Sequence, residues 1–351
     1  MTTPTETSAA TAPQSPAPTG WKKLRARLDL QLVILVIAIL LLMLFFATQS
    51  SVFLTSGNLL SILNQNASTF IVAAAAGLLL MAGYIDMSVG SVMALAGVCS
   101  AFASLDHGII PGILVGIAVG IAVGVFNGVL IGYIGLSPIV VTLGGLAAAR
   151  GLAQFLSPGS LYGLPPEVLQ LGSGKFLGIS YLVWTAIVIC AVIYFIASRL
   201  PAGKHTLAIG ANQRAAFLTG IPVKRFVFFL YVAIGATVGV AAILQVARLG
   251  SAPSGTLGLG FEVAVLTAVL LGGVPFTGGR GSVFGVLLGV WLIAVLNNGL
   301  TLMNVPPEAS GIVTGLVLIL AAAASLSGFQ KRRRKSRRTT LNTTAIQQIQ
   351  K

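Results

Sequence analysis

The sequence has few charged side chains, cysteines or histidines. Only 8% of its 351 residues are charged, and Asp and Glu together number seven against 21 Lys and Arg. Soluble domains carry about 25% charged residues, so this composition excludes an ordinary soluble protein. Two cysteines and two histidines exclude a disulfide framework and a Cys/His metal site. Instead, 56% of the residues are hydrophobic and the mean hydropathy is +0.97, which indicates an integral membrane protein.

The net charge of +14 could be read as a sign of nucleic-acid binding, but its distribution argues against that. Eighteen of the 21 basic residues fall in four blocks, which are 22–27, 199–225, Arg280 and 331–351. The positive-inside rule places such blocks in the cytoplasm. We therefore expect no nucleic-acid partner, and we expect the basic C-terminal tail to contact anionic membrane lipid.

The composition divides the chain into three regions. Residues 1–28 predict a disordered cytoplasmic tail, rich in Thr, Ser, Ala and Pro, with a basic juxtamembrane end. Residues 29–328 predict one transmembrane domain, and residues 329–351 a basic cytoplasmic tail. The first apolar run is long for a signal peptide and lacks a cleavage site, so we expect it to be a retained helix.

The fold class that we expect is all-α and membrane-spanning, with about ten helices. A spanning helix needs about 20 apolar residues. The expected spans are 30–48, 66–84, 88–104, 110–133, 138–157, 179–199, 225–247, 261–275, 282–302 and 309–328. An even number returns the C-terminus to the cytoplasm, in agreement with the charges, and leaves 157–180 outside. The segment from Gly83 to Gly90 predicts a broken or re-entrant turn.

Glycines recur every fourth residue in two of the apolar runs. The stripes are Gly112, Gly116, Gly120 and Gly124, then Gly281, Gly285 and Gly289. Small residues at this spacing let a second helix backbone pack closely. Each run ends in Asn-Gly, and this parallel indicates an internal repeat of a helical unit.

Few polar side chains lie on or near the apolar runs. The carboxylates Asp86 and Glu262 are costly there, so they are either a proton- or ion-coupling pair or structural groups. As structural groups they would cap helices or pair with Arg150 or Arg280. Six residues are candidates for a translocation pathway: Asn64, Asn66, Asp86, Asn127, Asn297 and Asn298. Hydrogen bonding between helices is the alternative for each of them.

The long basic segment between two spans contains a second feature. Residues 212–218 predict a short helix, stopped by Gly220 and Pro222, that either docks a soluble partner or lies on lipid. The chain has no P-loop, so we expect no bound cofactor and no catalytic or metal-binding residues in it. If ATP drives transport, the ATP and Mg bind to another polypeptide.

Five collinear segments resemble the membrane permeases of ribose-type, simple-sugar bacterial ABC importers. They are 82–97, 125–153, 208–221, 247–263 and 269–300, spread over the whole membrane domain. The resemblance implies transport of a sugar or sugar-like solute across the inner membrane of a bacterium. It also implies a homo- or heterodimer of permeases, a cytoplasmic ATP-binding subunit and an extracytoplasmic solute-binding protein.

The resemblance further identifies 208–221 as a coupling helix seated in a groove of the ATPase. The residues that it assigns to coupling are Gly210, Asn212, Arg214, Ala215, Ala216 and Gly220. The family usually has an acidic residue at the position of Gln213 or Arg214, so we expect the groove to differ here. Residues 250–260 and 157–180 would face the binding protein.

The residues are also compatible with two other functions. One is a proton-coupled secondary transporter that uses Asp86 and Glu262. The other is a membrane scaffold whose basic tail recruits a partner.

Overall fold

The computed structural model describes residues 30–306, 308–313, 315–317 and 319. The predicted tails, 1–28 and 329–351, lie outside the described residues, as does much of the predicted span 309–328. The helices are α2 (Leu30–Gln49), α3 (Ser56–Met81), α4 (Val89–His107), α5 (Ile109–Gly128), the π-helix η1 (Val129–Ile134), α6 (Pro138–Leu156), α7 (Pro166–Ser173), α8 (Tyr181–Arg199), α9 (Pro201–Ala211), α10 (Gln213–Leu218), α11 (Val223–Leu249), α12 (Phe261–Leu271) and α13 (Val283–Leu302). The strands are β1 (Ser160–Leu161), β2 (Lys175–Phe176), β3 (Ile179–Ser180) and β4 (Ala252–Pro253).

The predicted all-α membrane fold is confirmed. In the described part of the chain, eight helices are long and apolar enough to cross a membrane, counting α5 and η1 as one, and two shorter apolar helices accompany them. One of the short helices is α12, whose 11 residues rise only about 16 Å, roughly half of a bilayer core. It ends before Gly272 and Gly273, where the prediction had continued it to residue 275.

The second span begins ten residues earlier than predicted. The prediction began it at Asn66, the last residue of the polar run Asn64–Gln65–Asn66, whereas α3 begins at Ser56. Its N-terminus is fixed by the Thr55 hydroxyl, which accepts the Asn58 N–H at 3.3 Å. The polar residues are accommodated inside the helix, because the Asn66 amide donates to the Ile62 carbonyl one turn back.

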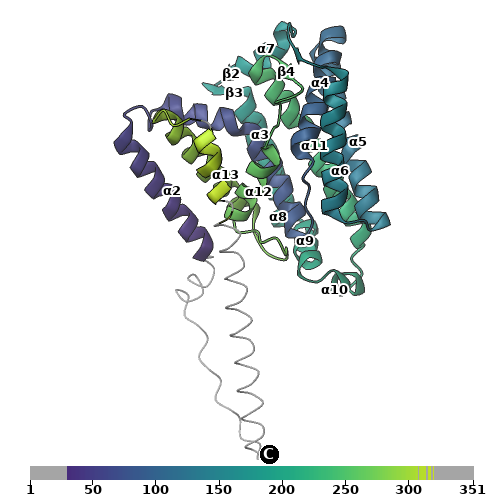
Figure 1. Ribbon diagram of the computed structural model, residues 1–351. Coiled ribbons are helices and arrows are strands. Elements are labelled where there is room, and N and C mark those ends of the chain that lie inside the picture. The colour runs from purple at the N-terminus through teal and green to yellow at the C-terminus, as the bar shows by residue number, and fades with distance from the viewer. Residues whose placement is uncertain (1–29, 307, 314, 318, 320–351) are drawn as a thin grey trace, which may run out of the picture.

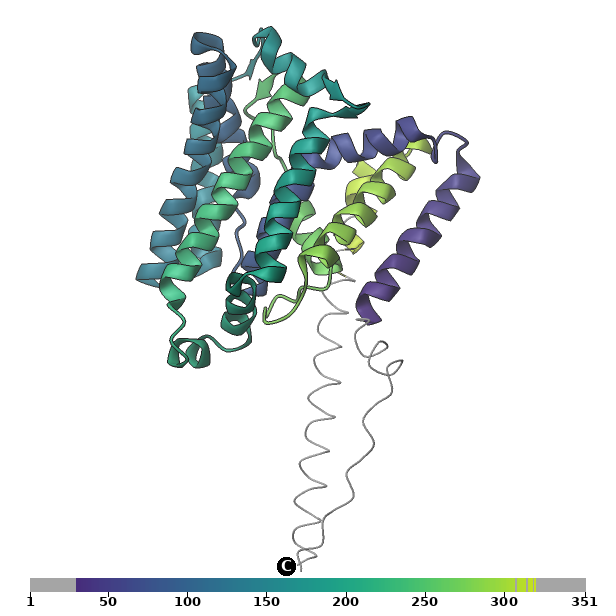
Figure 2. The ribbon, with the colours of Figure 1, turned by 180° about the vertical axis from the view of Figure 1, so that it is seen from behind.

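The bundle has two distinct ends. Helix α7 and the strands lie at one end, and α9 and α10 lie at the other; we call these the α7 end and the α10 end (Figures 1 and 2). At the α7 end β1 pairs antiparallel with β4, with Ser160 opposite Pro253. This pairing joins the segment after α6 to the segment after α11, which are the two regions that the sequence had placed on the outer side.

Helices α5 and α11 pack backbone to backbone along the predicted glycine stripe. Gly120 lies against the Gly235 carbonyl, and a Cβ on Gly120 would also be 2.9 Å from the Gly239 nitrogen. Gly124 lies against the backbone of Tyr231 in the same way. Only hydrogen fits at these positions, so the predicted packing role of the stripe is confirmed.

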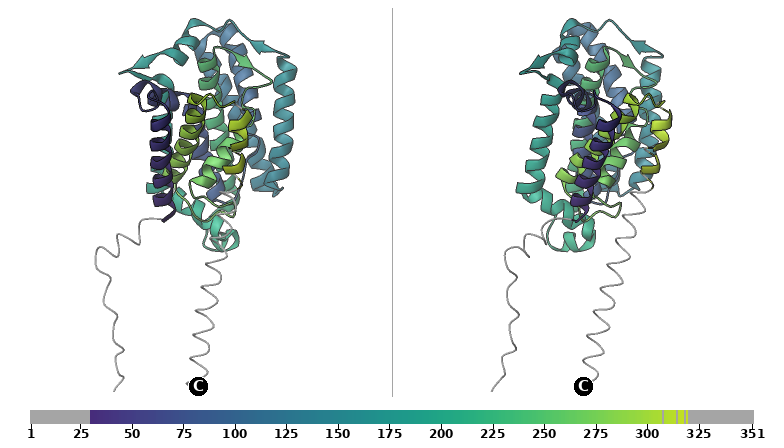
Figure 3. Two further views of the ribbon diagram at one scale, coloured as in Figure 1. Left: turned by 60° about the vertical axis from the view of Figure 1, so that its left-hand side comes forward. Right: turned by 90° about the vertical axis from the view of Figure 1, so that its left-hand side faces the viewer.

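Two glycines of the second stripe pack α13 on α12, whereas its first member, Gly281, lies in the turn before α13 with a φ of 130°. Gly289 contacts the Ala268 carbonyl, and Gly285 contacts that of Gly272. Helix α13 also contacts α2, which forms one edge of the bundle (Figure 3). There Gly299 lies on the ring of Phe46, which stacks on Phe53 with ring centroids 5.6 Å apart.

We predict that Gly120→Ala destabilises the protein by about 1–3 kcal/mol, because the new methyl group must push α11 away. Thermal unfolding in detergent should show a lower midpoint than that of the wild type. Gly151→Ala on α6 is the matched control, since nothing lies within 4 Å of its Cβ position. Equal midpoints for the two variants would show that the close α5–α11 contact is not required.

Candidate functional site

The segment 82–88 interrupts the helical structure in the interior of the bundle. Helix α3 ends at Met81, Gly83 has a φ of 84°, and α4 begins only at Val89. The Tyr231 hydroxyl on α11 donates to the Ile85 carbonyl at 2.8 Å. This bond satisfies a backbone carbonyl that lies outside any helix. The prediction of a broken turn between Gly83 and Gly90 is therefore confirmed.

A polar cluster lies where this segment joins α4. One Asp86 carboxylate oxygen accepts the Ser88 N–H at 2.8 Å and the Ser88 hydroxyl at 2.5 Å. Asn127 on α5 donates to the other oxygen of Asp86 at 3.5 Å and to the Ser88 hydroxyl at 3.3 Å. Asn127 is 1% exposed, and its Oδ1 has no partner among the described residues. Two of the six predicted pathway residues are thus in contact.

The other four predicted pathway residues lie elsewhere. Asn298 and Asn58 exchange two amide hydrogen bonds, at 2.9 and 3.0 Å, between α13 and the start of α3. Asn64 accepts the Ser180 hydroxyl at 2.9 Å, and Asn66 bonds within α3. Asn297 is next to Asn298 on α13. The hydrogen bonds of Asn64 and Asn298 fit the alternative role of bonding between elements.

Arg150 on α6 holds the segment between α11 and α12. Its guanidinium donates to the carbonyls of Ser254 and Leu257 at 3.0 and 2.8 Å, and to Gly90 at 3.5 Å. Glu262, in the first turn of α12, packs against Gly90 and interacts electrostatically with Arg150. The sequence left Arg150 and Arg280 open as structural partners of the two carboxylates. In the structure Glu262 has Arg150 as its partner, whereas Asp86 bonds to Ser88 and Asn127.

The predicted short helix over 212–218 is confirmed as α10, but the segment 208–221 as a whole is not one continuous helix. The chain forms α9, breaks at Asn212 and continues as α10, since the Asn212 side chain caps α10 by accepting the Ala215 N–H at 3.0 Å. Helix α9 was not predicted, although Pro201 at its first position is a recognisable start signal. The predicted stop at Gly220, which has a φ of 85°, is confirmed.

The residues assigned to coupling fall into two groups. Gly210 and Ala216 are enclosed, Gly210 against the Met81 carbonyl and Gly279, and Ala216 at 4% exposure. The others are exposed on or beside α10: Asn212, Arg214, Ala215 and Gly220.

A three-way junction connects α9 and α10 to the broken segment. The Gly279 N–H donates to the Met81 carbonyl at 2.8 Å, and Gly278 lies against Gly83. A Cβ on Gly279 would lie 2.9 Å from the Ala211 nitrogen. In addition, the Tyr84 side chain bonds to that of Gln213 on α10. The turn before α13 thus packs between the end of α3 and the end of α9.

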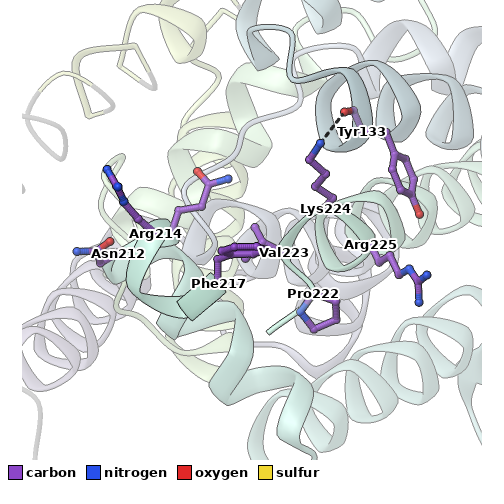
Figure 4. A pocket seen from close by; sticks show the side chains of 9 residues that line it. Tyr133, Asn212, Arg214, Phe217, Pro222, Val223, Lys224 and Arg225 are labelled. Carbon is purple, nitrogen blue, oxygen red and sulfur yellow. Dashed lines mark hydrogen bonds between the residues drawn. The ribbon is translucent and has the colours of Figure 1, made fainter. Parts of the chain in front are cut away.

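A pocket of about 670 Å³ lies between α10, the end of η1 and the start of α11. Figure 4 shows Phe217 and Val223 in its middle and the basic residues Arg214, Lys224 and Arg225 around it. The Lys224 ammonium donates to the Tyr133 carbonyl at 3.4 Å. We call this the basic pocket.

No cluster of His, Cys, Asp or Glu in the described part of the chain could hold a metal ion.

Comparison with known proteins places the whole arrangement in a family. Residues 58–322 match the family described as the permease component of branched-chain amino acid transport systems. This match covers the broken segment, α9, α10 and the glycine stripes. The chain belongs to this permease family.

Individual relatives of the permease are named for sugars. The D-allose transport system permease protein of Escherichia coli (strain K12) is 31% identical over 283 residues, which are 80% of this chain and 86% of that protein. The L-arabinose ABC transporter permease protein of Azospirillum brasilense is 34% identical over 84% of this chain and 86% of its own length. For the ribose import permease protein of Bacillus subtilis (strain 168) the identity is 35%, with 77% and 84% covered. No solved structure matches the chain significantly.

We predict that Asp86 acts as a hydrogen-bond acceptor at the start of α4. Asp86→Ala leaves the Ser88 N–H and the Asn127 amide without this acceptor, which costs about 1–3 kcal/mol of stability. Asp86→Asn keeps one acceptor oxygen, so its unfolding midpoint in detergent should lie between those of the wild type and Asp86→Ala. A midpoint for Asp86→Asn as low as that of Asp86→Ala would show that the carboxylate charge, and not its acceptor geometry, is required.

Proposed function

We propose that this ABC permease subunit carries a sugar or sugar-like solute across the inner membrane of a bacterium. The observation that carries the proposal is the extent of the similarity to permeases named for allose, arabinose and ribose, which spans about four-fifths of the chain. The hydroxyl and amide groups of Ser88 and Asn127 suit a solute rich in hydroxyl groups. These groups lie beside the non-helical segment 82–88, and solute sites of transporters form at such interruptions between helices.

The orientation follows from the charges. At the α10 end lie the basic residues Arg199, Lys204, Arg214, Lys224, Arg225 and Arg280. This end is therefore proposed to be cytoplasmic, together with both termini, by the positive-inside rule. The α7 end, with its paired strands β1 and β4, would then face an extracytoplasmic solute-binding protein.

The other components are proposed to be separate polypeptides. The chain works as a dimer with an identical or related permease, and a cytoplasmic ATP-binding subunit holds the ATP and Mg. The permease itself catalyses no reaction. It supplies two conformations, and the ATPase and the loaded binding protein change their relative free energies.

The α9–α10 region is proposed to couple the ATPase to the permease. Asn212, Arg214, Ala215 and Gly220 offer an exposed surface, while Gly210 and Ala216 hold that surface to the bundle. A displacement of α10 reaches segment 82–88 by two routes, the backbone contacts of Gly210 and Gly279 and the Tyr84–Gln213 hydrogen bond. That segment carries Asp86, so motion at the cytoplasmic end would reorganise the polar cluster.

The pathway is proposed to pass the polar cluster. Asp86 and Asn127 are the pair that best supports it, because they meet at the broken segment and Asn127 has an unused buried oxygen. The pathway role of Asn64, Asn66, Asn297 and Asn298 stays a prediction.

We predict that the assembled importer takes up solute into right-side-out vesicles. Uptake should require ATP on the cytoplasmic face, which is inside these vesicles, and a sugar-loaded binding protein on the outside. Radiolabelled ribose, arabinose and allose should be tested beside leucine. Dissipating the proton gradient with an uncoupler should leave ATP-driven uptake unchanged. Uptake that survives ATP depletion but ends with the proton gradient would contradict the proposal, and leucine as the only transported solute would contradict the sugar assignment.

We predict that Ala215→Arg prevents co-purification of the ATP-binding subunit, since a long charged side chain on the exposed face of α10 blocks a close-fitting groove. Ala215 is exposed, so the variant should still fold and insert into the membrane. Gln170→Arg on exposed α7 adds the same charge at the opposite end and should leave the complex intact. An intact complex with Ala215→Arg would remove α10 from the coupling surface.

A further inference from the structure

The basic pocket combines a cationic rim with an apolar floor. Its rim is formed by Arg214 from α10 and by Lys224 and Arg225 from the first turn of α11, all three exposed. Its floor includes Phe217, which is 67% exposed although it is large and apolar. Figure 4 shows Phe217 lying flat across the middle, with Arg214 on one side and Lys224 on the other. Such a site offers both charge and apolar contact to one ligand.

The positive charge of the pocket is not neutralised by any described residue of the chain. Among the residues that the structure describes, no ion pair is formed by Arg214, Lys224 or Arg225. The described acidic residues are Asp86 in the interior, Asp106 at the end of α4, Glu167 on α7, Glu262 on α12 and Glu308 after α13. None of these lines the pocket. The described part of the chain therefore supplies no carboxylate to this pocket.

The pocket is also rigidly built. Its α10 wall is held by the Asn212 cap and by the buried Ala216, and its turn is set by the left-handed Gly220 and by Pro222. The Lys224 ammonium is held beside the end of η1 by its bond to the Tyr133 carbonyl (Figure 4). A preformed surface loses little conformational entropy when a ligand binds.

The position of α10 favours a protein ligand over a lipid headgroup. Helix α10 is the outermost described element at its end of the bundle, beyond the ends of α5 and α11 (Figures 1 and 2). A phosphate headgroup would use the cationic rim but not the exposed face of Phe217. An acidic peptide segment with a neighbouring apolar side chain would use both.

We propose that the basic pocket binds an acidic segment of the cytoplasmic ATP-binding subunit, with at least one of its carboxylates in contact with Lys224. This inference rests on the proposed function, which supplies the partner, and adds the chemistry that the partner must present. It makes the first turn of α11 part of the docking surface, in addition to α10. The attraction is electrostatic, so high salt weakens it.

A zero-length carbodiimide cross-link tests the contact directly, because it joins a lysine amine only to a carboxylate that touches it. The permease is co-expressed and purified with the ATP-binding subunit encoded beside it, and the complex is then treated. We expect a permease–ATPase adduct whose joined peptides include Lys224. Lys224→Arg keeps the charge but removes the reactive amine, so this adduct should be lost while co-purification persists. Lys204→Arg, at an exposed lysine of α9 outside the pocket, should keep the adduct.

Charge reversal gives a second, independent readout. The triple change Arg214→Glu, Lys224→Glu and Arg225→Glu should weaken binding of the ATPase at least about tenfold, because like charges placed together cost several kcal/mol. An unchanged affinity, or an adduct that persists through Lys224→Arg, would overturn the inference while the wild-type complex still upheld the proposed function. Loss of co-purified anionic lipid with the ATPase still bound would identify the pocket as a lipid site and overturn it too. A wild-type chain that binds no ATPase would overturn both proposals.

Discussion

Backbone groups inside an apolar bundle must find hydrogen-bond partners in the protein, and this requirement governs the arrangement of the whole chain. Segment 82–88 meets it with the Tyr231 hydroxyl of α11 and with its own Asp86 carboxylate. The Met81 carbonyl just before the segment accepts the Gly279 N–H from the turn before α13. The non-helical backbone of the segment is therefore possible only where α11, the turn before α13 and the end of α9 surround it. The broken segment and its enclosure depend on each other.

Glycine makes that enclosure close enough. The contacts between α5 and α11, between α12 and α13, and at the Gly210–Gly279 junction all bring backbone directly against backbone. At such distances any side chain would force the elements apart. These contacts therefore fix the helix positions, because no side chain that could change its rotamer lies between the backbones. A displacement at α10 is then passed on through backbone contacts and not absorbed by flexible side chains.

The two ends of the bundle are tied to the interior by different chemistry. At the α7 end Arg150 uses one guanidinium to hold the Ser254 and Leu257 carbonyls together with the start of α4. At the α10 end the ties are glycine contacts and the Tyr84–Gln213 pair. Both sets converge on the region from Met81 to Gly90. In an importer whose binding protein and ATPase act at opposite ends, this region is where their influences meet.

The sequence by itself determined the membrane fold, the broken turn and the packing role of the glycine stripes. Each of these depends on local composition and spacing, which hydropathy and the helical repeat translate directly into structure. It could not separate Asp86 and Asn127 from the other polar candidates, because which amides meet depends on helix rotations and long-range contacts. The short α12 and the partner of Glu262 were likewise decided by tertiary packing. The basic pocket belongs to the same class, since its η1 wall is distant along the chain from α10 and α11 and meets them only in the folded bundle.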